Sequence, residues 1–162
     1  MSTTISISKL ASKKEKYQAL IPQIKSLIKS ESDSIANQAN LCAVLKYAFD
    51  FFWVGFYWSN SKELVLGPFQ GPVACTRISF GKGVCGTAFQ NASSIIVPDV
   101  NLFEGHIACS SETQSEIVIP ILKNNKVIGV LDIDSDQKET FDDIDRIYLE
   151  EIAQLLIDSI DD

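Results

Sequence analysis

The chain has 162 residues, which is the size of one compact domain. Hydrophobic residues make up 46% and charged residues 22% of the sequence, and this balance excludes an intrinsically disordered, collagen-like or coiled-coil protein. The 14 Lys and Arg against 21 Asp and Glu give a formal net charge of −7. That sign is wrong for binding nucleic acid or an anionic membrane surface.

The sequence carries no visible secretion or membrane signal. Met1–Leu10 has no apolar stretch long enough for a signal peptide. The apolar run Phe51–Trp58 is much shorter than the roughly 18 residues of a membrane span. We therefore expect a cytoplasmic protein, in which the four cysteines serve in metal binding, catalysis, redox chemistry or core packing.

Two helices are predicted before residue 50. Apolar residues recur at helical spacing from Tyr17 to Ile28, and Pro22 marks a kink or a fresh helix start. A second helix begins near Ser32 and Asp33, which suit the N-cap. Its apolar stripe contains Ile35, Ala39, Cys42 and Leu45. Cys42 is therefore expected to lie in the core as a small hydrophobic residue.

The aromatic segment Phe51–Trp58 predicts a strand with two different faces. One face carries Trp53 and Tyr57 on either side of Gly55, so a gap separates the two rings. This gap would either admit a ligand or be closed by packing under a helix. The strand alone does not decide between the two.

Short strands follow at Glu63–Leu66 and Arg77–Phe80, with a Gly/Pro turn segment at 67–72 between them. Val84–Gln90 predicts a short helix whose N-terminus follows glycines. Cys85 lies in its first turn, where the helix dipole lowers the pKa of a thiol. We therefore expect Cys85 to be able to form a thiolate.

The rest of the chain predicts a strand at Ser94–Val97, a long loop, a hairpin and a helix. The loop Pro98–Ser115 is long for a compact domain, and such loops are often functional. Strands at 116–123 and 126–135 flank an Asn-Asn turn. Thr140, with Asp143 three residues later, is the expected cap of the last helix. The element order predicts one α+β domain with a mostly antiparallel six-stranded sheet flanked by helices.

The last strand places two carboxylates on one face. Asp132 and Asp134 alternate with apolar residues, and Glu116 at the start of the neighbouring strand joins them. If this face is buried, repulsion raises at least one pKa and provides a general acid at neutral pH. The alternative is that both aspartates lie at the strand end in water.

Three cysteines lie near the glycine segments and the long loop: Cys75, Cys85 and Cys109. Together with His106 they have the ligand types of a zinc site, although their spacing is not that of a structural zinc site. Cys109 and His106 also allow Cys-His hydrolysis, but their closeness in sequence makes an independent base awkward. The third hypothesis is thiol redox chemistry, in which one cysteine attacks an oxidised substrate and another resolves the intermediate as a disulfide.

Seven sequence blocks carry a family resemblance. In chain order between residues 53 and 134 they are WVGFY, LGPFQGPVAC, GKGVCGTA, VPDV, GHIAC, SEIVIPI and IGVLDID. In these blocks the chain resembles the free methionine-(R)-sulfoxide reductases, which are stand-alone GAF domains. The resemblance implies a single GAF/PAS-like domain over 1–162, with N-terminal helices in 1–50, sheet and active-site loop in 51–135, and a C-terminal helix in 136–162.

The resemblance also implies roles for the anomalous residues. It assigns the nucleophile to Cys109 of GHIAC and makes Cys75 and Cys85 candidate resolving cysteines, of which we rank Cys75 first. It assigns the substrate pocket to Trp53, Tyr57, Glu116, Asp132 and Asp134. Ser110 stands where many relatives are expected to have Asp, and Phe52 is a second difference that we expect to affect packing on the opposite face.

The activity implied by the resemblance is thiol-dependent reduction of free L-methionine-(R)-sulfoxide to L-methionine, which repairs oxidised free methionine. It proceeds through a cysteine sulfenic acid and an intramolecular disulfide. Thioredoxin, which receives its electrons from NADPH, reduces this disulfide again. We expect no bound cofactor or metal, and the resemblance is compatible with a homodimer. The alternative is a non-catalytic GAF sensor that binds a small metabolite or nucleotide and signals through a partner.

Overall fold

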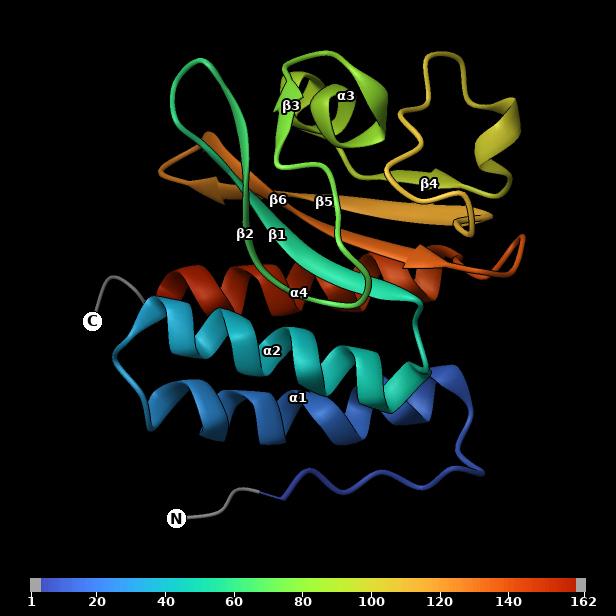
Figure 1. Ribbon diagram of the computed structural model, residues 1–162. Coiled ribbons are helices and arrows are strands. Elements are labelled where there is room, and N and C mark those ends of the chain that lie inside the picture. The colour runs from blue at the N-terminus through green and yellow to red at the C-terminus, as the bar shows by residue number, and fades with distance from the viewer. Residues whose placement is uncertain (1–3, 160–162) are drawn as a thin grey trace.

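A six-stranded antiparallel sheet divides the protein into two layers in the computed structural model (Figure 1). The structure describes residues 4–159, so 1–3 and 160–162 of the expected domain lie outside the described part. In spatial order the strands are β3 (Arg77–Ser79), β2 (Glu63–Gln70), β1 (Trp53–Ser59), β6 (Lys126–Ser135), β5 (Ser115–Lys123) and β4 (Ile95–Val97). The predicted α+β architecture is confirmed.

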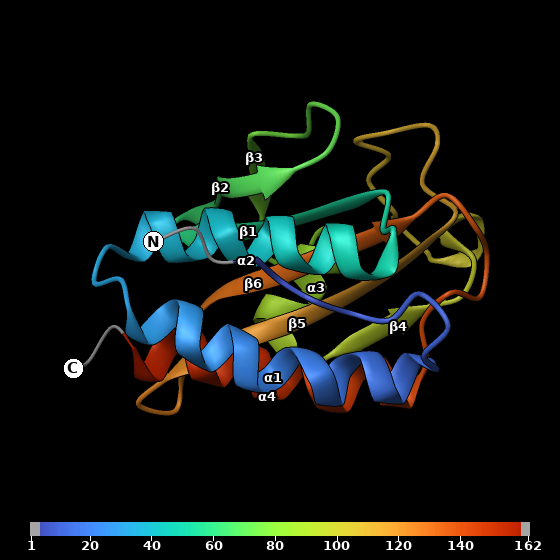
Figure 2. The same ribbon diagram turned by 90° about the horizontal axis from the view of Figure 1, so that it is seen from below.

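Three helices cover one face of the sheet: α1 (Lys13–Lys29), α2 (Ser34–Phe49) and α4 (Asp143–Asp158). Figures 1 and 2 show α2 and α4 against the sheet, with α1 packed on both of them. Alternate residues of the central strands, such as Phe56, Ile119 and Leu131, point into this layer and form the larger apolar core with the helices. Cys42 is buried there, as expected.

The helix boundaries follow from their caps, with three differences from the sequence prediction. Helix α1 starts with a capping box between Ser12 and Glu15 and runs through Pro22 as one helix, without a fresh start. Asp33 caps α2 as expected, but Ile35 is 67% exposed because its side chain lies on the solvent side of the first turn, in which Asn37 is buried. The cap of α4 is Asp142, since its side chain accepts two backbone N–H groups.

Thr140, the residue expected to cap α4, has a different role. Its hydroxyl is bonded to the Ser135 hydroxyl and the Gln137 carbonyl oxygen, in the turn that follows β6. The expected turn at 67–72 is also partly wrong, because β2 continues to Gln70. Opposite Gly55 and Tyr57 of β1, the pairing register of β2 shifts by one residue. This bulge accommodates Gly67 and Pro68 inside β2.

The opposite face of the sheet carries α3 (Gly83–Asn91), the single 3₁₀ turn Val100–Leu102 that interrupts the expected long loop, and the segments that connect them. Residues that alternate with the first core, such as Tyr57, Val118 and Val130, form a second apolar cluster with α3. Within residues 4–159, no helix has the length and apolar character that crossing a membrane requires. The sequence motifs with chemical character lie on this second face.

Candidate active site

Sheet register brings the carboxyl groups of β5 and β6 together. Asp134 on β6 lies opposite Trp53 on β1 and opposite Glu116 on β5. Residues directly opposite one another share a face of the sheet, so these three side chains form one row on the α3 side. Asp132 lies one step along β6, between Gly55 and Val118. The three carboxyls predicted as a group therefore form the floor of one site.

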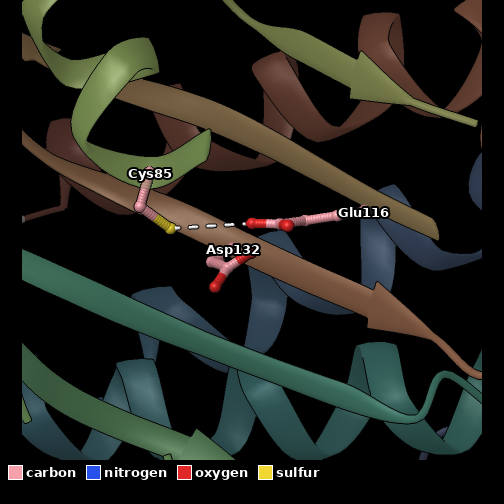
Figure 3. Close-up of side chains that lie close together, drawn as sticks. All are labelled: Cys85, Glu116 and Asp132. Carbon is pink, nitrogen blue, oxygen red and sulfur yellow. Dashed lines mark hydrogen bonds between the residues drawn. The ribbon is translucent and has the colours of Figure 1, made fainter. Parts of the chain in front are cut away.

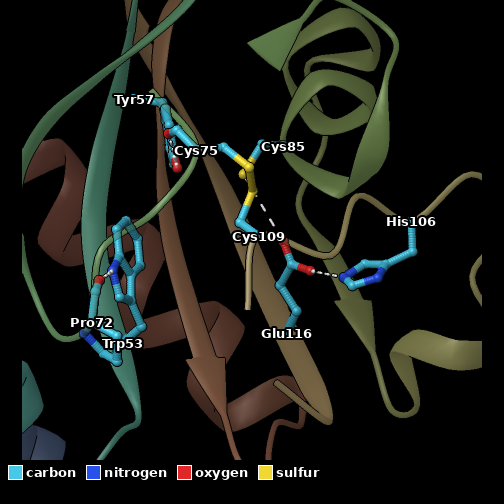
Figure 4. The surroundings of a disulfide bond; sticks show 8 residues. All are labelled: Trp53, Tyr57, Pro72, Cys75, Cys85, His106, Cys109 and Glu116. Atoms are coloured by element: carbon cyan, nitrogen blue, oxygen red, sulfur yellow. Dashed lines mark hydrogen bonds and ion pairs between the residues drawn. A yellow bond between two sulfur atoms is a disulfide. The ribbon is translucent and has the colours of Figure 1, made fainter. Parts of the chain in front are cut away.

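A disulfide between Cys75 and Cys109 closes this site (Figure 4). Cys75 lies between β2 and β3, and Cys109 lies in the loop before β5, 34 residues further along the chain. Their Cα atoms are 5.3 Å apart, within the normal range for a disulfide. Among the predicted cysteines, the structure therefore pairs the expected nucleophile with the resolving cysteine that we ranked first.

Trp53 and Tyr57 hold the segment that carries Cys75. The Trp53 indole N–H donates to the Pro72 carbonyl oxygen at 3.0 Å, and the Tyr57 hydroxyl donates to the Cys75 carbonyl oxygen at 2.9 Å (Figure 4). The expected gap above Gly55 is closed, because a Cβ at that position would overlap the Trp53 ring. Both aromatic residues line the pocket with their rings 6.0 Å apart, so any ligand lies beside them and not between them.

The carboxyl groups on the floor are buried, which rules out the alternative of a strand end in water. Glu116 and Asp132 are each 6% exposed, and Asp134 is partly buried. Loss of hydration, and next the neighbouring negative charges, raise the pKa of all three carboxyls well above their usual values. The pKa of each carboxyl is therefore shifted in the direction that a general acid requires.

Cys85 lies in the first turn of α3 as expected, but its surroundings oppose the formation of a thiolate. Its Sγ is 3.9 Å from Glu116 Oε1, beside Asp132 (Figure 3). Burial, and next the charges of Asp132 and Glu116, raise the pKa of the Cys85 thiol well above its usual value. The effect of the helix N-terminus on this thiol, which we expected to dominate, is outweighed by desolvation and like charge.

His106 contacts a carboxyl group and has no hydrogen bond or ion pair with Cys109. Its Nε2 is 3.4 Å from Glu116 Oε2 (Figure 4), and burial lowers the pKa of the imidazole. A Cys-His pair for hydrolysis is therefore not formed. The predicted zinc set is also wrong for this structure, because two of its cysteines are joined to each other. The contact of His106 with Glu116 was missed, although the histidine lies within one of the quoted sequence blocks.

Further residues that line the pocket include Phe52, Lys82 and Ser110. Phe52 precedes the first residue of β1, so strand alternation does not assign it to the opposite face, and the expectation that it only affects packing there is wrong. Ser110 directly follows Cys109 and so lies beside the disulfide. Lys82 is the only one of the three with a positive charge.

The comparisons with known proteins agree with this geometry. The GAF domain family model matches residues 39–161. GAF domain-containing protein A of Dictyostelium discoideum is 56% identical, over 96% of this chain and 99% of its own. The free methionine-R-sulfoxide reductase of Saccharomyces cerevisiae is 42% identical, over 94% of this chain and 89% of its own. The chain belongs to the free methionine-(R)-sulfoxide reductase family.

Solved structures give the same family and the same fold. The free methionine-R-sulfoxide reductase of Neisseria meningitidis, solved in complex with its substrate, is 47% identical with a TM-score of 0.96 over 99% of this chain and 96% of its own. As a member of this reductase family, the chain is an oxidoreductase with a GAF fold. Once its disulfide is reduced to two thiols, Cys75 and Cys109 can supply two electrons and two protons to an oxidised substrate above the buried carboxyl groups.

Proposed function

We propose that this chain reduces free L-methionine-(R)-sulfoxide to L-methionine. One observation carries the proposal: the Cys75–Cys109 disulfide lies in a pocket whose floor holds buried carboxyl groups with raised pKa values. A sulfoxide needs both an electron pair from a nucleophile and a proton on its oxygen, and this pocket supplies both. The similar reductases of yeast and Neisseria, named for this activity, support the same substrate.

In the first step, the Cys109 thiolate attacks the sulfur of the bound sulfoxide. The oxygen is transferred from the substrate sulfur to the sulfur of Cys109. The sulfur–oxygen bond of the sulfoxide breaks, Cys109 becomes a sulfenic acid and methionine departs. A protonated carboxyl among Glu116, Asp132 and Asp134 donates the proton that the oxygen needs, because an unprotonated oxygen is a poor leaving group. The pocket-lining rings of Trp53 and Tyr57 provide an apolar wall for the methyl group.

In the second step, the Cys75 thiol attacks the sulfenic acid sulfur of Cys109. A sulfur–sulfur bond forms and water leaves, so the two cysteines have together supplied two electrons and two protons for each sulfoxide reduced. The described structure then corresponds to the enzyme after this step, with Cys85 still a free thiol. An external dithiol, for which we propose thioredoxin in the cytoplasm, restores the two thiols by disulfide exchange.

The disulfide itself supports this order of events. Cys109 lines the pocket and is bonded to Cys75, so its sulfur is not available to attack a sulfoxide. Substrate is therefore reduced only after the disulfide has been opened to two thiols.

The test uses the R and S epimers of free methionine sulfoxide separately, with methionine formation coupled to NADPH oxidation through thioredoxin and its reductase. We expect turnover of the R epimer only. Dithiothreitol in place of thioredoxin separates the chemistry from the recycling partner, and a peptide that contains methionine sulfoxide serves as the control for free substrate. If neither epimer turns over with either reductant, the proposal is wrong and the chain is better described as a GAF sensor.

A further inference from the structure

We propose that Cys85, Glu116 and Asp132 form a binding site for a thiophilic divalent cation, with Zn²⁺ as the specific case. One sulfur or oxygen atom from each residue lies within 4.8 Å of the other two, and all three side chains are buried (Figure 3). They come from α3, β5 and β6, so the fold and not sequence spacing brings them together. This set differs from the zinc ligands considered from the sequence, since it shares only Cys85 with them.

An unsatisfied atom points to a ligand at this position. Asp132 is more than nine-tenths buried, and its Oδ1 has no hydrogen-bond partner within the described residues. Its carboxyl lies beside both Cys85 and Glu116 (Figure 3). A buried carboxylate oxygen without a hydrogen-bond partner is unfavourable, and native proteins contain very few such atoms. A cation held between the three residues would satisfy it.

The spacing suits zinc after small side-chain movements. Zinc binds thiolate at about 2.3 Å and carboxylate oxygen at about 2.0–2.2 Å, which in a tetrahedron separates the sulfur and oxygen by about 3.5 Å. The Sγ of Cys85 and Oε1 of Glu116 are already 3.9 Å apart. His106, next to the other oxygen of Glu116, can hold that carboxylate in orientation from outside, as is common around zinc. The fourth position faces the pocket and is open to water.

The ligand types decide which cation fits. A thiolate and three protein ligands favour Zn²⁺ over Ca²⁺ or Mg²⁺, which need more oxygen ligands and avoid sulfur. On binding, the thiol of Cys85 loses its proton to solvent and the two carboxyls bind as anions. The cluster lines the pocket, so an ion reaches it from the pocket even in the disulfide form.

One consequence rests on the proposed function. Zn²⁺ at this site occupies two of the carboxyls that we propose as proton donors, so it would inhibit the reductase and raise the apparent KM for sulfoxide. Metal binding itself does not depend on that activity. The two ideas therefore have separate measurements, namely a metal spectrum and the epimer assay.

The experiment uses Co²⁺ as a spectroscopic substitute for Zn²⁺. In the disulfide form, Cys42 and Cys85 are the free cysteines, so a thiolate-to-cobalt charge-transfer band can come from one of only two residues. We expect the band in the oxidised protein and in Cys42→Ser, and its loss on adding Zn²⁺ and in Cys85→Ser. Asp132→Asn should weaken Co²⁺ binding at least about tenfold.

Two results would overturn the proposal: no charge-transfer band in the oxidised parent protein, or a band that persists in Cys85→Ser. Circular dichroism of each variant establishes that it has folded. If Cys85→Ser does not fold, Asp132→Asn takes its place, and unchanged Co²⁺ affinity in that variant is equally decisive against the site.

Discussion

The Tyr57 hydroxyl donates a hydrogen bond to the backbone carbonyl oxygen of Cys75, so a core residue of β1 fixes the position of a disulfide cysteine. Tyr57 is only 1% exposed, and burial, more than the nearby carboxylates, raises the pKa of its hydroxyl. The hydroxyl therefore stays protonated and remains a donor. Tyr57 acts on Cys75 as a positioning residue, in addition to its expected place in the pocket wall.

Tyr57→Phe tests this positioning. The change leaves the Cys75 carbonyl oxygen without its donor, at a cost of about 1 kcal/mol. We expect the equilibrium constant for forming the disulfide, measured against dithiothreitol, to fall about fivefold, which corresponds to that energy. Redox titration of the thiols measures the effect, with the exposed Tyr47→Phe as the matched control. Identical titrations of Tyr57→Phe and the parent protein would show that this hydrogen bond does not guide disulfide closure.

Cys109→Ser tests the nucleophile. A serine hydroxyl is a far weaker nucleophile toward sulfur, so we expect turnover of the R epimer to fall at least about 1,000-fold. Cys42→Ser is the matched control, because Cys42 lies in the other core, and burial raises its pKa to about 12. It should keep the parental kcat with some loss of stability. Substantial turnover by Cys109→Ser would move the nucleophile to another cysteine.

Cys75→Ser separates chemistry from recycling. Without a resolving partner, Cys109 should still reduce one sulfoxide per protein molecule and stop as a sulfenic acid, which dimedone labels and mass spectrometry detects. Cycling with thioredoxin should be lost. Sustained cycling in this variant would instead assign the resolving role to Cys85, the remaining free thiol in the pocket.

The sequence predicted the elements of this site well, because hydrophobic alternation carries the information. The strand pattern around Asp132 and Asp134 placed both on one face, and the register then added Glu116 from the next strand. The cap at Asp33 and the burial of Cys42 were predicted by the same local rules. The partner of Cys109 stayed open between Cys75 and Cys85, with Cys75 ranked first, since connectivity cannot be read from spacing; the structure joins Cys109 to Cys75.

What the sequence could not predict depends on side-chain directions and on contacts between distant segments of the chain. The space above Gly55 is closed by the ring of its own neighbour Trp53, a matter of side-chain direction and not of residue type. The pKa of the Cys85 thiol is raised by burial and next by two carboxyls from β5 and β6. The helix rule considered only the local backbone. His106 similarly meets Glu116 through folding of the loop.

Asp134→Asn tests the proton donor. Burial, and next the charge of Asp132, raise the pKa of the Asp134 carboxyl, so it acts as an acid below that raised pKa and fails as pH rises through it. Loss of a general acid should lower kcat by about 100-fold or more and remove or shift the alkaline limb of the pH profile. The profile of kcat/KM from pH 5 to 9 measures this. A parental rate and profile would leave Glu116 or Asp132 as the donor.

Stability should depend on pH in a direction set by the same carboxyls. Because folding raises the pKa of Glu116, its contribution to stability is fully present below the unfolded value of about 4.3 and is lost as pH rises through the folded value. Glu116→Gln removes this titration. Relative to the parent, its Tm should therefore rise as pH is increased from 5 to 9.

About 1 kcal/mol shifts the Tm of a domain of this size by about 2–4 °C, so a calorimeter resolves the effect. Measuring the difference between variant and parent at each pH cancels every other titrating group that the two share. Glu112→Gln, at an exposed glutamate in the loop that precedes β5, is the control for the substitution itself. A difference for Glu116→Gln that does not change with pH would mean that Glu116 ionises as easily in the folded protein as in the unfolded chain.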